Sequence, residues 1–107
     1  DKNGERSYEV ELYRLKGELL QRAEGRKQKA EIEAEAEAYF RQALEVARHQ
    51  GAKSWELRTA MSLSRLWQRQ GKKEEARKML AEIYGWFTEG FDTSDLKEAK
   101  AMLDSME

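Results

Sequence analysis

Arginine is the residue type whose spacing in this sequence most clearly suggests a chemical task. Arg58 is followed by Arg65 and Arg69 at spacings of seven and eleven residues, which places all three on one face of a predicted helix over about three turns. A guanidinium group presents a planar fork that binds a carboxylate through two parallel hydrogen bonds. A row of arginines on one helix face therefore predicts a surface that binds an acidic peptide or an acidic region of a protein.

An earlier helix contributes to the same predicted surface. If Gly17 occupies the place that Ser64 occupies in the later helix, polar residues of the first helix, with Glu11 and Glu18 among them, fall beside the arginine row. The predicted binding residues are Arg14, Gln21, Arg22, Arg58, Met61, Arg65, Gln68 and Arg69. The alternative is that these arginines form ordinary helix-surface ion pairs, worth about 0.2–0.5 kcal/mol each, and bind no ligand.

Side chains suited to catalysis are scarce. The chain has no cysteine and a single histidine, His49, so thiolate metal sites and nucleophile–histidine pairs are excluded. His49 comes at the predicted end of a helix, where a cationic ring stabilises the negative helix end. The glutamates of residues 31–37 lie on a helix that water reaches, whereas a hydrolytic pair needs burial to raise one pKa. We therefore predict no catalytic residue, no cofactor and no metal, and expect that the protein is not an enzyme.

The composition predicts a small helical domain. Twenty basic and 21 acidic residues give the 107-residue chain a net charge of −1, so no overall field attracts nucleic acid or an anionic membrane. Charged residues make up 38% of the chain and proline is absent, which favours long uninterrupted helices. No apolar run is long enough to span a bilayer and no signal-peptide pattern opens the chain, so a cytoplasmic protein is expected.

Glycines mark the predicted ends of the helices. Gly25, Gly51, Gly71 and Gly90 each follow a stretch with apolar residues at helical spacing, and glycine readily adopts the left-handed conformation that closes a helix. Ser54, and either Asp92 or Thr93, are the expected N-terminal caps of later helices. Residues 1–7 are expected to form a disordered tail. The predicted helices are Tyr8–Glu24, Ala30–Gln50, Ser54–Gln70, Lys73–Glu89 and Ser94–Met106.

The helical pattern repeats after 40 residues. Ala36, Phe40 and Ala43 have the same spacing as Ala76, Leu80 and Ile83. Each stripe is preceded by a helix with a stripe of its own, formed by Leu12, Leu15 and Leu19 in the first case and by Ala60, Leu63 and Trp67 in the second. Repeated helix pairs predict an all-α solenoid over residues 8–107, with two antiparallel helical hairpins (8–51 and 52–90) and a C-terminal capping helix (93–106).

The second hairpin resembles a tetratricopeptide (TPR) repeat in the pattern A60-x2-L63-S64-x2-W67-x3-G71-x4-A76-x3-L80-x2-I83. HEAT-like helix pairs are the architectural alternative, because their period also fits. Residues 36–103, particularly the segment YGWFTEGFDTSDL, resemble the C-terminal TPR-like region of bacterial multidomain signalling proteins. Those proteins carry a nucleotide-cyclase or transcriptional-regulator domain and a predicted ATPase domain. The resemblance implies a non-catalytic region of such a protein, and no residue here inherits the activities of the other domains.

These features together predict a non-catalytic protein-interaction module of a bacterial signalling protein. It would bind a protein or an acidic peptide on the surface lined by the first helix of each hairpin. Two alternatives stay open. Self-association without an outside ligand is favoured if the first helix exposes Tyr8, Leu12 or Leu15. Nucleic-acid binding through the arginine row is the other alternative, and the near-zero net charge argues against it.

Overall fold

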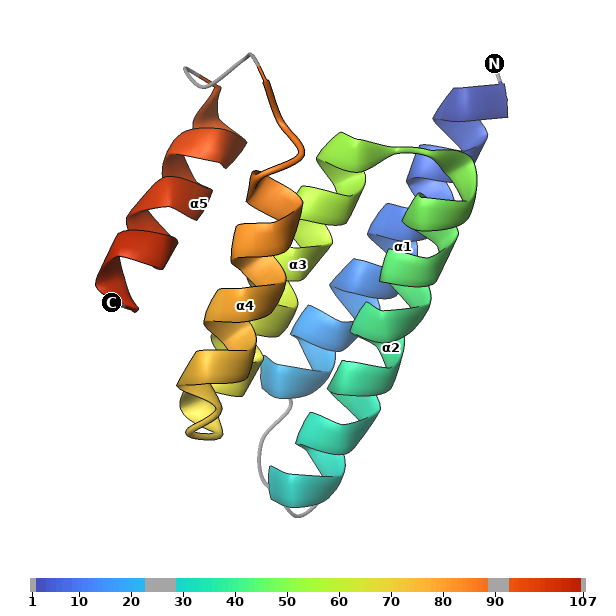
Figure 1. Ribbon diagram of the computed structural model, residues 1–107. Coiled ribbons are helices and arrows are strands. Elements are labelled where there is room, and N and C mark those ends of the chain that lie inside the picture. Colours follow the sequence, from blue (N-terminus) through green and yellow to red (C-terminus); the bar gives the residue numbers. More distant parts are fainter. Residues whose placement is uncertain (1, 23–28, 89–92, 107) are drawn as a thin grey trace.

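The computed structural model describes residues 2–22, 29–88 and 93–106, with side chains described from Tyr8 to Leu20 in the first range, and the regular structure of these ranges is entirely helical. This confirms the predicted all-α class. Figure 1 shows α1 and α2 running antiparallel side by side, α3 and α4 doing the same, and α5 at the far end. The helices are α1 (Lys2–Arg22), α2 (Lys29–Gln50), α3 (Lys53–Arg69), α4 (Lys73–Tyr84) and α5 (Ser94–Ser105).

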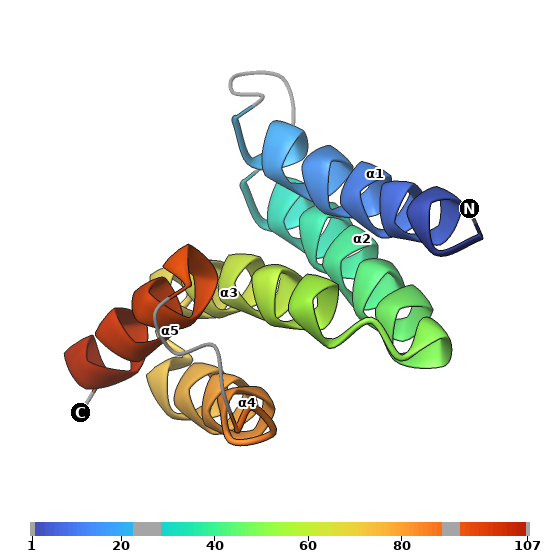
Figure 2. The same ribbon diagram turned by 90° about the horizontal axis from the view of Figure 1, so that it is seen from above.

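Helix α3 lies at the centre of the molecule. It contacts each of the other four helices, and Figure 2 shows it between the α1–α2 pair and the α4–α5 pair. The molecule measures 43 × 38 × 20 Å. Because one helix with its side chains is about 10–12 Å across, the shortest dimension corresponds to two layers of helices.

Helices α2 and α3 end in the same way, at Gly51 and Gly71. Both glycines are left-handed, with φ of 68° and 81°. In each case the amide of the residue after the glycine donates a hydrogen bond to the carbonyl five residues earlier, at 2.9 Å from Ala52 and 2.8 Å from Lys72. This pairing is the Schellman motif, which satisfies carbonyls that the helix leaves free. The two predicted glycine stops are therefore confirmed, while Gly25 and Gly90 lie outside the described residues.

The first helix begins, and the fourth helix ends, at a different residue than predicted. Helix α1 is helical from Lys2, where a disordered tail was expected over residues 1–7, because extending an existing helix costs far less than nucleating one. Helix α4 ends at Tyr84 and not near residue 89. Gly85 disfavours continuation by about 1 kcal/mol. The amides of Trp86 and Phe87 then bond to carbonyls three residues earlier, at 3.1 and 3.2 Å, which is the tighter 3₁₀ pattern that closes a helix.

Only one of the predicted N-terminal caps is present in the described ranges. The Thr93 hydroxyl accepts a hydrogen bond from the amide of Leu96 at 3.4 Å and caps α5. Asp92, its predicted alternative, lies outside the described residues. Helix α3 begins at Lys53, so Ser54 is inside the helix and the expected cap there is wrong. The Schellman turn of α2 places Ala52 at the cap position, and alanine has no oxygen with which to cap the helix.

The two repeated stripes form the centre of the core. All six residues of the stripes on α2 and α4 are buried. Five of them belong to the main hydrophobic cluster, and Ala43 belongs to a smaller cluster. The stripe predicted on α3 is also inward, with Ala60 and Leu63 buried and Trp67 packed against the same cluster. The 40-residue shift found in the sequence therefore relates two sets of buried side chains, which sit against the preceding helix in each pair.

The first helix does not pack through the stripe that was predicted for it, which consisted of Leu12, Leu15 and Leu19. Helix α1 instead turns Val10, Tyr13, Gly17 and Leu20 inward, and these contact the core clusters or α2 directly. Gly17 allows the closest approach, because a Cβ atom added there would lie 2.7 Å from the Phe40 ring. Phe40 is fully buried, so its ring has no free space into which to move. The leucines of the predicted stripe face away from α2.

Gly17→Ala tests this contact. We expect it to lower the free energy of unfolding by about 1 kcal/mol, because overpacking costs about 1–3 kcal/mol and alanine regains only about 1 kcal/mol of helix propensity. In a Phe40→Leu background the same change should raise stability, since the smaller side chain leaves room for the methyl group. Urea denaturation of the four chains measures both effects. An effect of the same sign in both backgrounds would show that Phe40 does not limit position 17.

Candidate functional site

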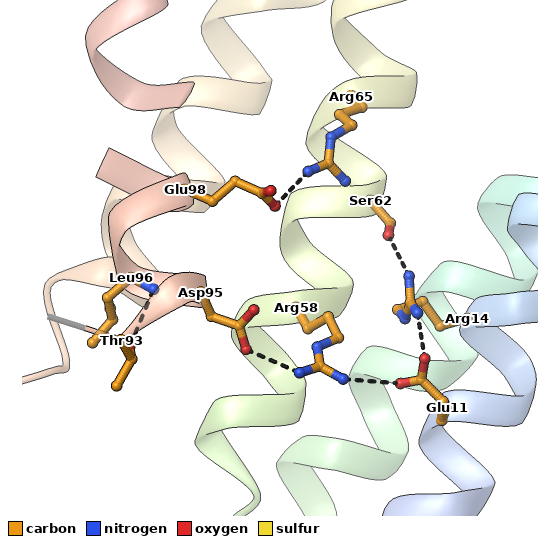
Figure 3. A network of polar contacts seen from close by, with 9 residues as sticks. All are labelled: Glu11, Arg14, Arg58, Ser62, Arg65, Thr93, Asp95, Leu96 and Glu98. Carbon is orange, nitrogen blue, oxygen red and sulfur yellow. Dashed lines mark hydrogen bonds and ion pairs between the residues drawn. The ribbon is translucent and has the colours of Figure 1, made fainter. Parts of the chain in front are cut away.

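Two of the three α3 arginines that were predicted to bind an acidic peptide bind carboxylates of the same chain. Arg58 donates to Asp95 of α5 at 3.2 Å, and Arg65 donates to Glu98, one turn further along α5, at 2.7 Å. Figure 3 shows both pairs joining the two helices. Helix α5 therefore supplies to the arginine row the acidic partners that an external peptide was expected to supply.

The α1 side of the same surface is also paired within the molecule. Arg14 forms ion pairs with Glu11 and, at 3.6 Å, with Glu18, and it donates to the Ser62 hydroxyl of α3 at 3.3 Å. Glu11 lies 3.7 Å from Arg58, so a chain of charges runs from α1 across α3 to α5 (Figure 3). Most of these groups are partly exposed, and such pairs are worth about 0–1 kcal/mol each. We call this set the ionic seam.

The remaining predicted binding residues do not complete an open groove. Met61 is 2% exposed and belongs to the core, so it cannot contact a ligand in this structure. Gln68 is partly buried and Arg69 is exposed at the last turn of α3. Gln21 and Arg22 are in α1, but their side chains lie outside the described part of the chain. Spacing identified a common face correctly for Arg58 and Arg65, but it could not identify the helix that covers them.

An apolar surface lies on the outer side of α1. Tyr8, Leu12, Leu15 and Leu19 are 72%, 39%, 45% and 63% exposed. Their spacing of four, three and four residues keeps them on one side of the helix, opposite the side that meets α2. We call these four residues the α1 stripe. Tyr8, Leu12 and Leu15 were named as residues that an outer helix could expose, and Leu19 was not.

Two hollows lie where α1 meets α2, and Leu19 at the end of the α1 stripe borders the smaller one. The smaller, of about 390 Å³, is lined by Lys16, Leu19, Leu20 and Tyr39. Lys16 borders it with its ammonium group 5.7 Å from the ring centre of Tyr13 and 5.8 Å from that of Tyr39, and the two rings stack on each other. The larger hollow, of about 500 Å³, is lined by Glu9, Gln42, Glu45, Val46, His49 and Gln50. Both open to solvent, so neither is an enclosed ligand cavity.

His49 lies where the sequence predicted it, in the last turn of α2, and it is exposed. Glu9 and Glu45 line the same hollow. Within residues 2–22, 29–88 and 93–106, no three side chains of the metal-binding types come together in a way that could hold an ion. Of the helices in these ranges, none combines the length and the apolar character needed to cross a lipid bilayer.

A second polar cluster, at Glu37, holds α2 to α3. Its carboxylate accepts hydrogen bonds from the Trp67 indole at 3.2 Å and from Arg41 at 2.8 Å, and the Arg41 guanidinium lies 5.6 Å from the Trp67 ring centre. Burial raises the pKa of Glu37, but the hydrogen bonds from Arg41 and Trp67 and the charges of Arg41 and Lys72 together outweigh burial and hold this pKa below its usual value. The cluster thus stabilises the ionised carboxylate in the folded state.

The lowered pKa predicts a pH dependence that Glu37→Gln removes. Because the folded pKa is lower than the unfolded one of about 4.3, the contribution of Glu37 is complete above pH 4.3 and is lost as the pH falls through the folded pKa. Thermal unfolding at pH 7 and at pH 3 measures it. The difference in stability between the wild type and Glu37→Gln should be largest at pH 7 and shrink at pH 3. Glu82→Gln, at an exposed position of α4, is the control and should show no such change.

Comparisons of the chain with protein-family models, with curated proteins and with solved structures yield no match.

Proposed function

We propose that this chain is a non-catalytic protein-interaction module with a TPR-like stack of helical hairpins, and that its contact surface is the α1 stripe. The stacked arrangement is supported by the contacts of α1 with α3 and of α3 with α5, since alternate helices of a repeat stack adjoin one another. It is supported further by the 40-residue shift between buried stripes and by the matching ends of α2 and α3.

One observation carries the choice of surface. Aligning Gly17 with Ser64, both of them buried, relates the α1 stripe to a set of α3 residues, two of which have contacts with the α1–α2 pair: Trp55 packs against its smaller cluster and Ser62 bonds to Arg14. Three of these residues are fully buried, and the fourth packs against a cluster formed by α1 and α2. In chain order the set is Trp55, Thr59, Ser62 and Leu66. Helix α3 thus buries most of the face that α1 leaves in water.

An exposed apolar row on a helix is typical of a protein contact. Folded chains seldom leave several large apolar side chains together in water, because burying each one is favourable. Residues three and four apart on a helix form the row that an amphipathic partner helix recognises. The α1 stripe has this spacing over about three turns, and it therefore favours a partner that presents a helix.

The ionic seam has a different role in this proposal. Arg58 and Arg65 are bound to Asp95 and Glu98, so an acidic peptide would have to displace carboxylates of α5 before it could bind. The proposal therefore assigns these arginines to the attachment of α5. The nucleic-acid alternative needs the same arginines for phosphate contacts, and no contact in the described ranges favours it. That the module belongs to a bacterial signalling protein is an inference from the sequence resemblance alone.

Site-specific photocrosslinking tests the proposed surface. Leu15 is replaced by the photoreactive residue p-benzoylphenylalanine, and Ala101, exposed on α5, is replaced in the same way as the matched control. After illumination both in cells and of the purified chain at about 1 mM, the upper end of the dissociation constants expected for a weak contact, we expect a discrete protein adduct from position 15 and none from position 101. If neither position gives an adduct, or both give the same set, the α1 stripe is not a protein contact and the proposal fails.

A further inference from the structure

We propose that the partner of the α1 stripe is a second copy of this chain, with the two α1 helices packed antiparallel about a two-fold axis that passes between Leu12 and Leu15. This inference rests on the proposed function and names its partner. The pairing is isologous, which means that both copies use the same surface. In such a dimer each α1 stripe covers the other, so no third chain is needed to remove these side chains from water.

The spacing of the stripe suits such a pairing. Steps of four, three and four residues are those of the apolar seam of a coiled coil, in which side chains of one helix fit between side chains of the next. In the antiparallel arrangement, Leu12 lies opposite Leu15 of the second copy, and Tyr8 lies opposite Leu19. Tyr8, the largest side chain of the stripe, thereby meets Leu19, its most exposed leucine, at each end of the helix contact. The two less exposed leucines, Leu12 and Leu15, meet at the axis.

Charges along one edge of the stripe favour the antiparallel direction. Glu9 and Lys16 are both exposed on the side of α1 that borders α2. Turning the second helix around places Glu9 of each copy beside Lys16 of the other, so the axis generates two ion pairs of opposite charge. A parallel pairing would instead bring Lys16 towards Glu11, whose carboxylate is already held by Arg14 and Arg58.

On the opposite edge of the stripe, the ionic seam makes the antiparallel pairing more favourable. An antiparallel pair brings Glu11 near Glu18 of the second copy, and two bare carboxylates there would repel each other. Both carboxylates are ion-paired with Arg14 within their own copy, and Glu11 also lies 3.7 Å from Arg58. The ionic seam therefore weakens the charge repulsion that opposes the dimer on this edge.

The size of the stripe sets the expected affinity. The four exposed fractions add up to about two fully exposed apolar side chains in each copy. Stable dimers bury a larger surface than this, and association also costs translational and rotational freedom. We therefore expect a weak dimer, with a dissociation constant between about 10 μM and 1 mM.

Sedimentation equilibrium between about 10 μM and 1 mM tests the proposal, because this range spans the expected dissociation constant. The wild type should move from monomer towards dimer, and Leu12→Glu combined with Leu15→Glu should stay monomeric. Ala101→Glu, which adds a charge away from α1, should dimerise like the wild type. A wild type that remains monomeric at 1 mM overturns the proposal, as does a dimer that survives the double glutamate variant.

Charge reversal tests the pairing with variants that leave the apolar residues intact. Glu9→Lys alone and Lys16→Glu alone should each weaken the dimer by about 3- to 30-fold at low salt, because each change turns two attractive pairs into two repulsive ones. The double variant restores opposite charges and should regain the wild-type dissociation constant. If the double variant is as weak as the single ones, the antiparallel arrangement is wrong.

The outcomes also separate this inference from the proposed function. A monomeric wild type whose position 15 still crosslinks to a different protein would overturn the second copy as partner and leave the α1 stripe as a protein contact. A monomeric wild type without any adduct from position 15 would overturn both. A crosslinked product with twice the mass of the chain supports both.

Discussion

Replacing Phe40 by alanine is expected to lower the free energy of unfolding by about 3–5 kcal/mol. Its ring is fully buried between α1 and α2, against the glycine that lets the two helices approach, and it belongs to the main hydrophobic cluster. Removing the ring loses its transfer free energy and leaves a cavity that the neighbouring helices only partly close. Since small domains are stable by about 5–15 kcal/mol, this single change threatens the folded state of the whole chain.

Urea denaturation monitored by circular dichroism measures this loss. Tyr39→Ala is the matched control, because Tyr39 is the adjacent residue and is only partly buried, with its ring stacked on Tyr13 at 6.4 Å. It should cost clearly less than Phe40→Ala. A cost below about 1.5 kcal/mol for Phe40→Ala would mean that the site closes over the missing ring, and that α1 is not held to α2 by this contact.

The second large effect concerns how α5 is held. Leu96 and Ala99 are buried against the main cluster, and Met106 accepts a weak hydrogen bond from the Ser64 hydroxyl at 3.9 Å. Leu96→Ala is expected to lower the free energy of unfolding by about 2–4 kcal/mol, because it removes most of a buried side chain from the main hydrophobic cluster. The apolar side of α5 should therefore account for most of its attachment.

Neutralising the acidic side of α5 is the matched comparison. Asp95→Asn combined with Glu98→Gln removes the charges that face Arg58 and Arg65, and we expect a loss below about 1.5 kcal/mol, because partly exposed ion pairs contribute little. Chemical denaturation of both variants at the same ionic strength makes the comparison. If the neutralised variant loses more stability than Leu96→Ala, the ionic seam holds α5 and the apolar contact is secondary.

Local sequence rules predicted the parts of the fold that depend on one helix at a time. The glycine stops at Gly51 and Gly71 follow from the left-handed conformation that glycine alone adopts cheaply. The buried stripes of α2 and α4 follow from helical periodicity. The early end of α4 was missed because Gly85 was not among the glycines taken as helix ends, although two aromatic residues follow it in a tighter turn.

The candidate site was harder to predict because it depends on which elements meet. Periodicity placed Arg58 and Arg65 on one face, but their partners Asp95 and Glu98 are more than thirty residues away, and spacing carries no signal for such a pair. The α1 stripe was found with the wrong neighbour, because an apolar row indicates that a face is suited to packing without indicating what it packs against. Gly17 could have indicated which side of α1 faces α2, since a glycine inside a helix often marks the close approach of another element.

The most direct test of the α1 stripe is an NMR dilution series on the chain with labelled leucine methyl groups. Between about 1 mM and 10 μM, a range that spans the expected dissociation constant, the signals of Leu12, Leu15 and Leu19 should change with concentration. Those of the buried Leu63, Leu80 and Leu96 should stay constant. Concentration-dependent changes confined to the buried leucines, or no change at any leucine, would contradict the account.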